Sequence, residues 1–212
     1  MALGGSATQA QQEMSRLQGV VATGRPEVET CDKRVEQSAP YQALRDRLGP
    51  RDGSAPLALK ANQEKATQAE VQELYALHQD YLTPCRKLRL ETASKIHPAM
   101  VAVLAEAFSK YDADLVRLTT RQISWGEYLT ARDAISAETQ AKIAGVGSAI
   151  NKNLNEAHAS EVARRQAAAS ALGQWAQQQQ VILQNQQAID AINRPRMTNC
   201  QYVGTYLNCT TF

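Results

Sequence analysis

The sequence predicts an all-α protein: an elongated antiparallel helical bundle or coiled-coil hairpin with a long C-terminal helix and a short disulfide-closed β-hairpin. Three observations predict this fold class. Apolar residues recur at intervals of three and four through most of the chain, and residues 125–192 contain no proline. Aromatic residues are only 5% of the 212 residues, too few for a thick globular core. We expect a helical domain over residues 1–195 and a hairpin tail over residues 196–212.

The first fifty residues predict three helices that are separated by prolines. Residues 6–23 can form the first, which "TGRP" should end. Pro26 suits the first turn of a second helix that carries Cys31 on its apolar face. Pro40 begins a short third helix. The Gly/Pro-rich stretch "GPRDGSAP" that follows predicts a loop.

The middle of the chain predicts a hairpin of two helices. Thr67 and Glu70 form a capping box at the start of the first helix. Pro84 lies inside this helix and should kink it near residues 80–84. After "IHPAM" the second helix repeats the apolar spacing. The two stripes are Val71, Leu74, His78, Tyr81, Cys85 and Leu88, then Val101, Leu104, Phe108, Tyr111, Leu115 and Leu118.

A second capping box, Ser124 with Glu127, begins the last helical region. We favour one helix over residues 125–192, straight or bent at the glycines near residue 146, with a length of ~100 Å at ~1.5 Å per residue. A partner for its Gln/Ala-rich end should be residues 6–23 or another copy of the chain. Its stripes are Ile135, Ile143, Val146, Ile150 and Leu154, then Leu172, Trp175, Ile182 and Ile189 with Gln179 and Gln186 in core-type positions.

The last fifteen residues, "TNCQYVGTYLNCTTF", predict a β-hairpin. With Gly204 and Thr205 in a two-residue turn, Cys200 falls opposite Cys209 in a non-hydrogen-bonded pair, where Cα atoms approach to about 4.5 Å. A disulfide spans such a distance, and an isolated hairpin is marginally stable without one. We therefore expect a bond between Cys200 and Cys209.

That pairing leaves Cys31 and Cys85 to each other, either as a disulfide or as two buried free thiols. A zinc site is disfavoured because no two cysteines have C-x-x-C spacing. Stable disulfides form in an oxidising compartment. The start of the chain lacks the charged and apolar regions of a signal peptide, so the protein is either cytosolic or an exported protein whose signal Met1 replaces; the cysteines favour export.

Composition and motifs exclude several function classes. A formal charge of +2 without a long Lys/Arg block disfavours nucleic-acid binding, and no apolar run is long enough to span a bilayer. His78, His97 and His158 lie in no catalytic motif, and we interpret each as structural or solvated. The sequence therefore predicts no catalytic residue, no metal site and no cofactor.

"ISWGEY" is the most distinctive internal peptide. Trp125 and Tyr128 in it either form an exposed aromatic contact for a partner or pack across the capped start of the helix. Tyr202 and Tyr206 in the tail lie on opposite faces of the predicted hairpin, so the hairpin can dock through either. These four residues are the predicted interaction surface.

Several peptides resemble a group of exported, mostly uncharacterised proteobacterial envelope proteins. They are Cys31 followed by "SAPY", then "PLALKANQEKATQAEVQEL", "PCRKLRLE" around Cys85, "ISWGEY" and the two-cysteine tail. The resemblance covers residues 28–130 and the tail. It implies a periplasmic or cell-surface location and a disulfide between Cys31 and Cys85, and it carries over no catalytic residue.

The function that follows is a non-enzymatic cell-envelope scaffold or protein-interaction module, with a protein partner or self-association. The alternative is a small-ligand or lipid-binding helical bundle in the periplasm. In that case Tyr81, Phe108, Tyr111 and Trp175 would line a cavity.

Overall fold

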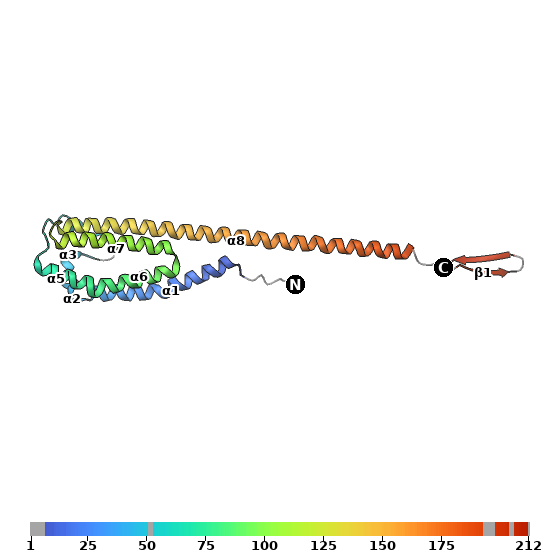
Figure 1. Cartoon of the computed structure of the whole chain (residues 1–212), viewed down its shortest axis with the longest axis horizontal. Coiled ribbons are helices and arrows are strands. Elements are labelled where there is room, and N and C mark those ends of the chain that lie inside the picture. Colours follow the sequence, from blue (N-terminus) through green and yellow to red (C-terminus); the bar gives the residue numbers. More distant parts are fainter. Residues whose placement is uncertain (1–6, 51–52, 193–197, 204–205, 212) are drawn as a thin grey trace. The chain divides into compact units, whose positions relative to one another are not determined.

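The computed structural model describes residues 7–50, 53–192, 198–203 and 206–211, with side chains through residue 189 (Figure 1). The chain divides into two units, Met1–His158 and Ala159–Phe212, and the boundary falls within the longest helix. The expected all-α character is confirmed by the helices. They are α1 Gln9–Glu36, α2 Ala39–Ala43, α3 Arg45–Leu48, α4 Leu57–Lys60, α5 Gln68–Ala76, η1 Leu77–Leu82, α6 Thr83–Ile96, α7 Pro98–Thr119 and α8 Trp125–Ile192.

One continuous helix, α1, replaces the two N-terminal helices that the sequence predicts. Thr8 caps it, because the Thr8 hydroxyl accepts a hydrogen bond from the backbone N–H of Gln11 at 3.2 Å. Pro26 lies inside α1 and removes the donor that would bond the carbonyl of Ala22. Ala22 is exposed, so water can bond this carbonyl and the helix continues. The predicted break at Pro26 was wrong.

A disulfide joins α1 to α6. Cys31 and Cys85 are bonded with their Cα atoms 5.7 Å apart, and both lie in the buried core. Gly24 lets the same two helices approach closely, since a Cβ atom there would lie 2.5 Å from Cγ2 of Thr92. Of the two alternatives for Cys31 and Cys85, a disulfide or two buried free thiols, the structure contains the disulfide.

A π-helical segment, η1, lies where the sequence predicts a kink. The backbone N–H of Thr83 donates to the carbonyl of His78, five residues earlier, and the Thr83 hydroxyl donates to the same carbonyl at 2.9 Å. Pro84 follows directly, and its ring needs space in the preceding turn. The wider π turn supplies that space, so the helix passes the proline with an expanded turn.

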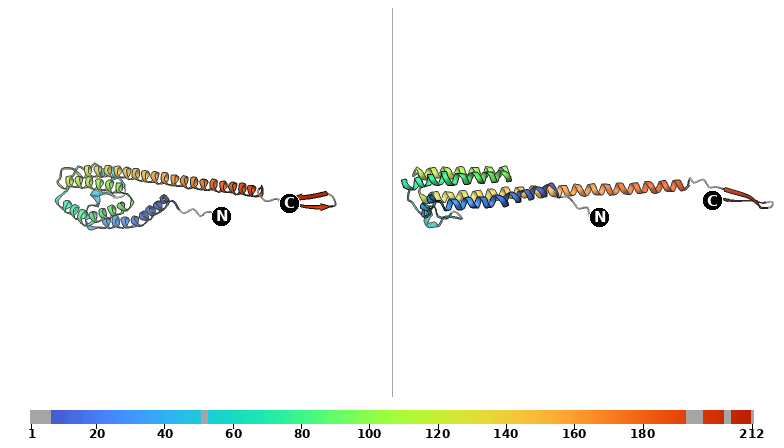
Figure 2. Two further views of the ribbon diagram at one scale, coloured as in Figure 1. Left: turned by 45° about the vertical axis from the view of Figure 1, so that its right-hand side comes forward. Right: turned by 90° about the horizontal axis from the view of Figure 1, so that it is seen from below.

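Four helical runs lie side by side in the first unit and alternate in direction (Figure 1, Figure 2). They are α1, η1 with α6, α7, and the first part of α8. Ion pairs join α7 to α8: Lys110 bonds Glu138 at 2.7 Å, and Lys142 bonds Glu106 at 2.8 Å. The core lies between these runs and includes Val35, Leu44, Leu74, Leu118 and Trp125.

Both capping boxes that the sequence predicts are present. Thr67 and Glu70 cap α5. At the start of α8, the Glu127 N–H donates to Ser124 Oγ at 3.2 Å, and the Ser124 N–H donates to the Glu127 carboxylate at 2.6 Å. Residues 125–192 form one helix, as expected.

The second unit contains the rest of α8 and two strands. Strand β1 Thr198–Val203 pairs antiparallel with β2 Tyr206–Thr211, and Cys200 is the pairing partner of Cys209. The proposed turn at residues 204–205 and the side chains of both cysteines lie outside the described residues. The disulfide-closed hairpin and the domain boundary at residue 195 therefore stay predictions.

Candidate functional site

A cavity of about 290 Å³ lies within the first unit. Its walls combine leucine and aromatic side chains with three arginines and one carboxylate. Such a mixture of apolar walls and a few polar groups is typical of small-molecule sites. The lining residues are Val35, Tyr41, Leu48, Gly53, Leu74, Leu77, Leu82, Cys85, Arg86, Arg89, Phe108, Tyr111, Leu115, Tyr128, Arg132, Asp133 and Ser136.

Arg86 is a largely buried cation in this lining, with 17% of its side chain exposed. Its Nη1 donates to Asp112 Oδ1 at 2.5 Å and lies 3.1 Å from Nε2 of His78. The guanidinium carbon lies 5.1 Å from the centre of the Phe108 ring, within the range of a cation–π contact. Within the described part of the chain, both polar contacts of Arg86 run through Nη1, and its Nε and Nη2 make none.

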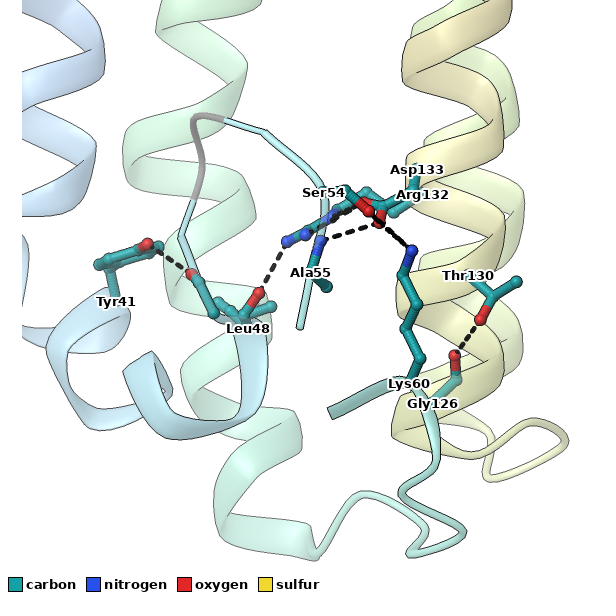
Figure 3. A network of polar contacts seen from close by, with 10 residues as sticks. Tyr41, Leu48, Ser54, Ala55, Lys60, Gly126, Thr130, Arg132 and Asp133 are labelled. Carbon is teal, nitrogen blue, oxygen red and sulfur yellow. Dashed lines mark hydrogen bonds and ion pairs between the residues drawn. The ribbon is translucent and has the colours of Figure 1, made fainter. Parts of the chain in front are cut away.

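The other two arginines hold neighbouring segments in place. Arg89 donates from Nη2 to Asp32 on α1 at 2.5 Å. Arg132 on α8 donates from Nη1 to the backbone carbonyl of Leu48 at 2.7 Å, and both residues line the cavity (Figure 3).

Asp133 fixes the loop before α4 onto α8. Its carboxylate accepts hydrogen bonds from the Ser54 hydroxyl at 2.6 Å and the Ala55 backbone N–H at 2.8 Å, and it pairs with Lys60 at 2.7 Å (Figure 3). Burial alone would raise the pKa of Asp133, but the bonds from Lys60, Ser54 and Ala55 outweigh it and hold the pKa well below its usual range. The carboxylate is thus ionised at neutral pH and already engaged.

Tyrosine hydroxyls supply further polar groups at the cavity. Burial raises the pKa of both Tyr111 and Tyr128, so both hydroxyls stay neutral at pH 7 and keep a proton to donate. Tyr41 donates its hydroxyl to the backbone carbonyl of Gly49 at 2.9 Å, next to the loop that Asp133 holds (Figure 3).

The structure corrects part of the predicted interaction surface. Trp125 is 0% exposed, because it packs across the capped start of α8, and its ring meets Tyr128 edge-on with centroids 6.3 Å apart. Tyr128 is half-buried and faces the cavity. Trp125 therefore offers no exposed contact. The side chains of Tyr202 and Tyr206 lie outside the described residues.

The four aromatic residues expected around a ligand do not act as one group. Phe108 and Tyr111 line the cavity. Tyr81 packs against the hydrophobic core and is not among the residues that line the cavity. Trp175 lies in the second unit and is 61% exposed. The sequence analysis did not identify the three arginines as site residues. One signal was present for Arg89, which follows Cys85 by four residues and therefore lies on the same face of the helix.

His97 and His158 each make a hydrogen-bond contact at the start of a helix. His97 caps α7, since its Nδ1 accepts the N–H of Ala99 at 3.1 Å. His158 Nδ1 lies 2.9 Å from the hydroxyl of Thr8, the residue that caps α1. Among the residues whose placement is described, no group of three or more His, Cys, Asp or Glu could hold a metal ion.

The later part of α8 forms a second candidate site, in the second unit. Every residue from 163 to 189 is exposed. The exposed fraction is 68% for Leu172, 49% for Ile182 and 55% for Ile189. Large apolar side chains on a helix normally pack against another element. Residues 163–189, here called the open segment, therefore present an apolar stripe that this chain leaves uncovered in its described part.

The chain shows no significant similarity to any protein-family model, curated protein or solved structure with which it was compared. Within the described ranges, none of the helices is both long and apolar enough to cross a membrane.

Proposed function

We propose that this protein is a non-enzymatic scaffold of the cell envelope, periplasmic or on the cell surface, that self-associates through the open segment. The observation that carries the proposal is the exposed stripe of α8. Leu172, Trp175, Gln179, Ile182, Gln186 and Ile189 follow one another at alternating intervals of three and four residues, the spacing of a coiled-coil seam.

A second copy of the chain is the partner that fits this stripe. Residues 166–189 contain no Asp, Glu, Lys or Arg, so an identical helix meets no like charge. In a parallel, in-register pair Gln179 faces Gln179 of the other copy, and Gln186 likewise faces itself. The two glutamine amides can hydrogen-bond each other across the seam. Polar residues at core positions of a coiled coil fix the register of its two helices in this way.

The proposed envelope location draws on other features. The disulfide between Cys31 and Cys85 is compatible with an oxidising compartment. The pairing of Cys200 with Cys209 across β1 and β2 would favour a second bond in the same compartment. The resemblance to exported proteobacterial envelope proteins supports the same location.

Cysteine cross-linking tests the proposal. Ile182→Cys places a thiol in the seam, where two parallel helices bring it to its own copy, and mild oxidation should yield a covalent dimer. Gln184→Cys, two residues on and away from the seam, is the matched control and should remain monomeric on the same gel. Light scattering of the unmodified protein should give the mass of a dimer. A monomer at tens of micromolar, with equal cross-linking at both positions, would refute self-association.

A further inference from the structure

We propose that the cavity of the first unit binds a small carboxylate with an apolar body, with Arg86 as the group that holds the carboxylate. The proposal goes beyond the scaffold function and does not depend on it. It rests on the size of the cavity, the imbalance of charge in its lining, and the free edge of one guanidinium.

The size of the cavity limits the ligand. At about 290 Å³ the cavity lies at the lower end of the range of small-ligand pockets, ~300–1,000 Å³. A ligand of about ten non-hydrogen atoms occupies similar space, which matches a medium-chain fatty acid. Leu74, Leu77, Leu82 and Leu115 give such a chain apolar surface.

The charges of the lining favour an anion. Arg86, Arg89 and Arg132 are cationic, while Asp133 is the carboxylate among the lining residues and pairs with both Lys60 at 2.7 Å and Arg132 at 3.2 Å. Asp32 and Asp112 pair with Arg89 and Arg86 from outside the lining. A ligand carboxylate would therefore meet more positive than negative charge on the cavity wall.

Arg86 has the geometry that a carboxylate requires. Asp112 and His78 meet its Nη1. The Nε and Nη2 donors form the opposite edge of the planar fork, and two parallel N–H groups on one edge bond both oxygens of a carboxylate. Because the Arg86 side chain is only 17% exposed, such a pair would form with little competition from water.

Binding of octanoate, which has ten non-hydrogen atoms, tests the proposal by isothermal titration calorimetry on the full chain. We expect one site per chain, and octanol and octylamine should bind at least tenfold more weakly. Arg86→Gln should reduce octanoate affinity at least tenfold. Arg25→Gln removes the same charge from a side chain that is 77% exposed on α1, and it should leave affinity unchanged.

A second variant separates loss of the site from loss of the fold. Leu115→Phe leaves Arg86 in place but fills part of the cavity, so it should also weaken octanoate binding at least tenfold. The thermal unfolding curve of each variant shows whether it is folded. Octanol binding as tightly as octanoate, or an unchanged affinity in folded Arg86→Gln protein, would overturn the proposal, because the ligand would then lie elsewhere, for example on the open segment.

Discussion

The backbone N–H of Gly126 donates to the carbonyl of Asn62 at 2.9 Å, which fixes the start of α8 onto the segment between α4 and α5. The adjacent N–H of Trp125 donates to the carbonyl of Glu64 at 3.0 Å. A Cβ atom on Gly126 would collide with the carbonyl oxygens of Lys60 and Asn62. The peptides "KANQEK" and "ISWGEY", distant in sequence, are thus held together by backbone contacts that only glycine permits at this position.

Gly126→Ala should therefore destabilise the protein. Alanine normally stabilises a helix interior relative to glycine by up to about 1 kcal/mol, but here the methyl group displaces backbone, which costs about 1–3 kcal/mol. At roughly 2–4 °C per kcal/mol for a chain of this size, Tm should fall by several degrees. Differential scanning calorimetry measures this shift.

Gly145→Ala is the matched control in the same helix. A Cβ atom on Gly145 meets no heavy atom within 4 Å, so the substitution should leave Tm unchanged or raise it slightly. Equal shifts for the two variants would contradict the close packing of Gly126.

Local signals predict the helix starts, and nonlocal contacts explain what the sequence analysis missed. Thr67 with Glu70 and Ser124 with Glu127 mark helix starts because a capping box involves only four neighbouring residues. Pro26 misleads because α1 is held across it by tertiary contacts with α6, at Gly24 and at Cys31. A proline is a weak indicator of a helix end when tertiary packing holds the helix on both sides of the proline.

The cavity could not be derived from spacing. Arg86 lies on α6 and Arg132 lies on α8, and their approach to one space depends on how the helices pack. Trp125 illustrates the converse: the sequence left open whether it packs or is exposed, and burial against Tyr128 decides for packing. Exposure of the open segment was likewise undecidable from the sequence, since residues 6–23 were an equally good partner.

Removal of the disulfide by Cys31→Ser with Cys85→Ser should lower the free energy of unfolding by about 4 kcal/mol. The bond joins residues 54 positions apart in the sequence and so restricts the unfolded chain. The corresponding fall in Tm is about 8–16 °C. The variant is preferable to a reducing agent, which would act on every disulfide of the chain. Denaturation of the variant at the same urea concentration as the unmodified protein would show that the bond adds no stability.

Asp133 should make the protein sensitive to acid. Its pKa is lowered in the folded state, so the group contributes stability above its unfolded pKa of about 3.9, and this contribution is lost as pH falls through the lower folded value. The urea midpoint should therefore decrease between about pH 4 and pH 2. Asp133→Asn should lower the free energy of unfolding at pH 7 by about 1–3 kcal/mol, and the urea midpoint should fall accordingly. The variant should also depend less on pH than the unmodified protein.

Glu156→Gln is the control for this experiment, since Glu156 is 65% exposed and pairs with Lys152 at 3.9 Å. Its urea midpoint should follow that of the unmodified protein from pH 2 to pH 7. A pH profile that Asp133→Asn leaves unchanged would contradict the role of this carboxylate in holding Ser54, Ala55 and Lys60.

Self-association through the open segment should depend little on salt. Exposed charges are screened by added salt, but residues 166–189 carry none, so the seam gains and loses no ion pair. Sedimentation velocity at 50 and 500 mM NaCl should give dissociation constants within about twofold of each other. Trp175→Gln, which removes the largest apolar side chain of the stripe, should weaken the dimer at least tenfold at both salt concentrations, whereas Gln177→Ala outside the seam should not. Dissociation at high salt in the unmodified protein would instead place the interface on the charged helices of the first unit.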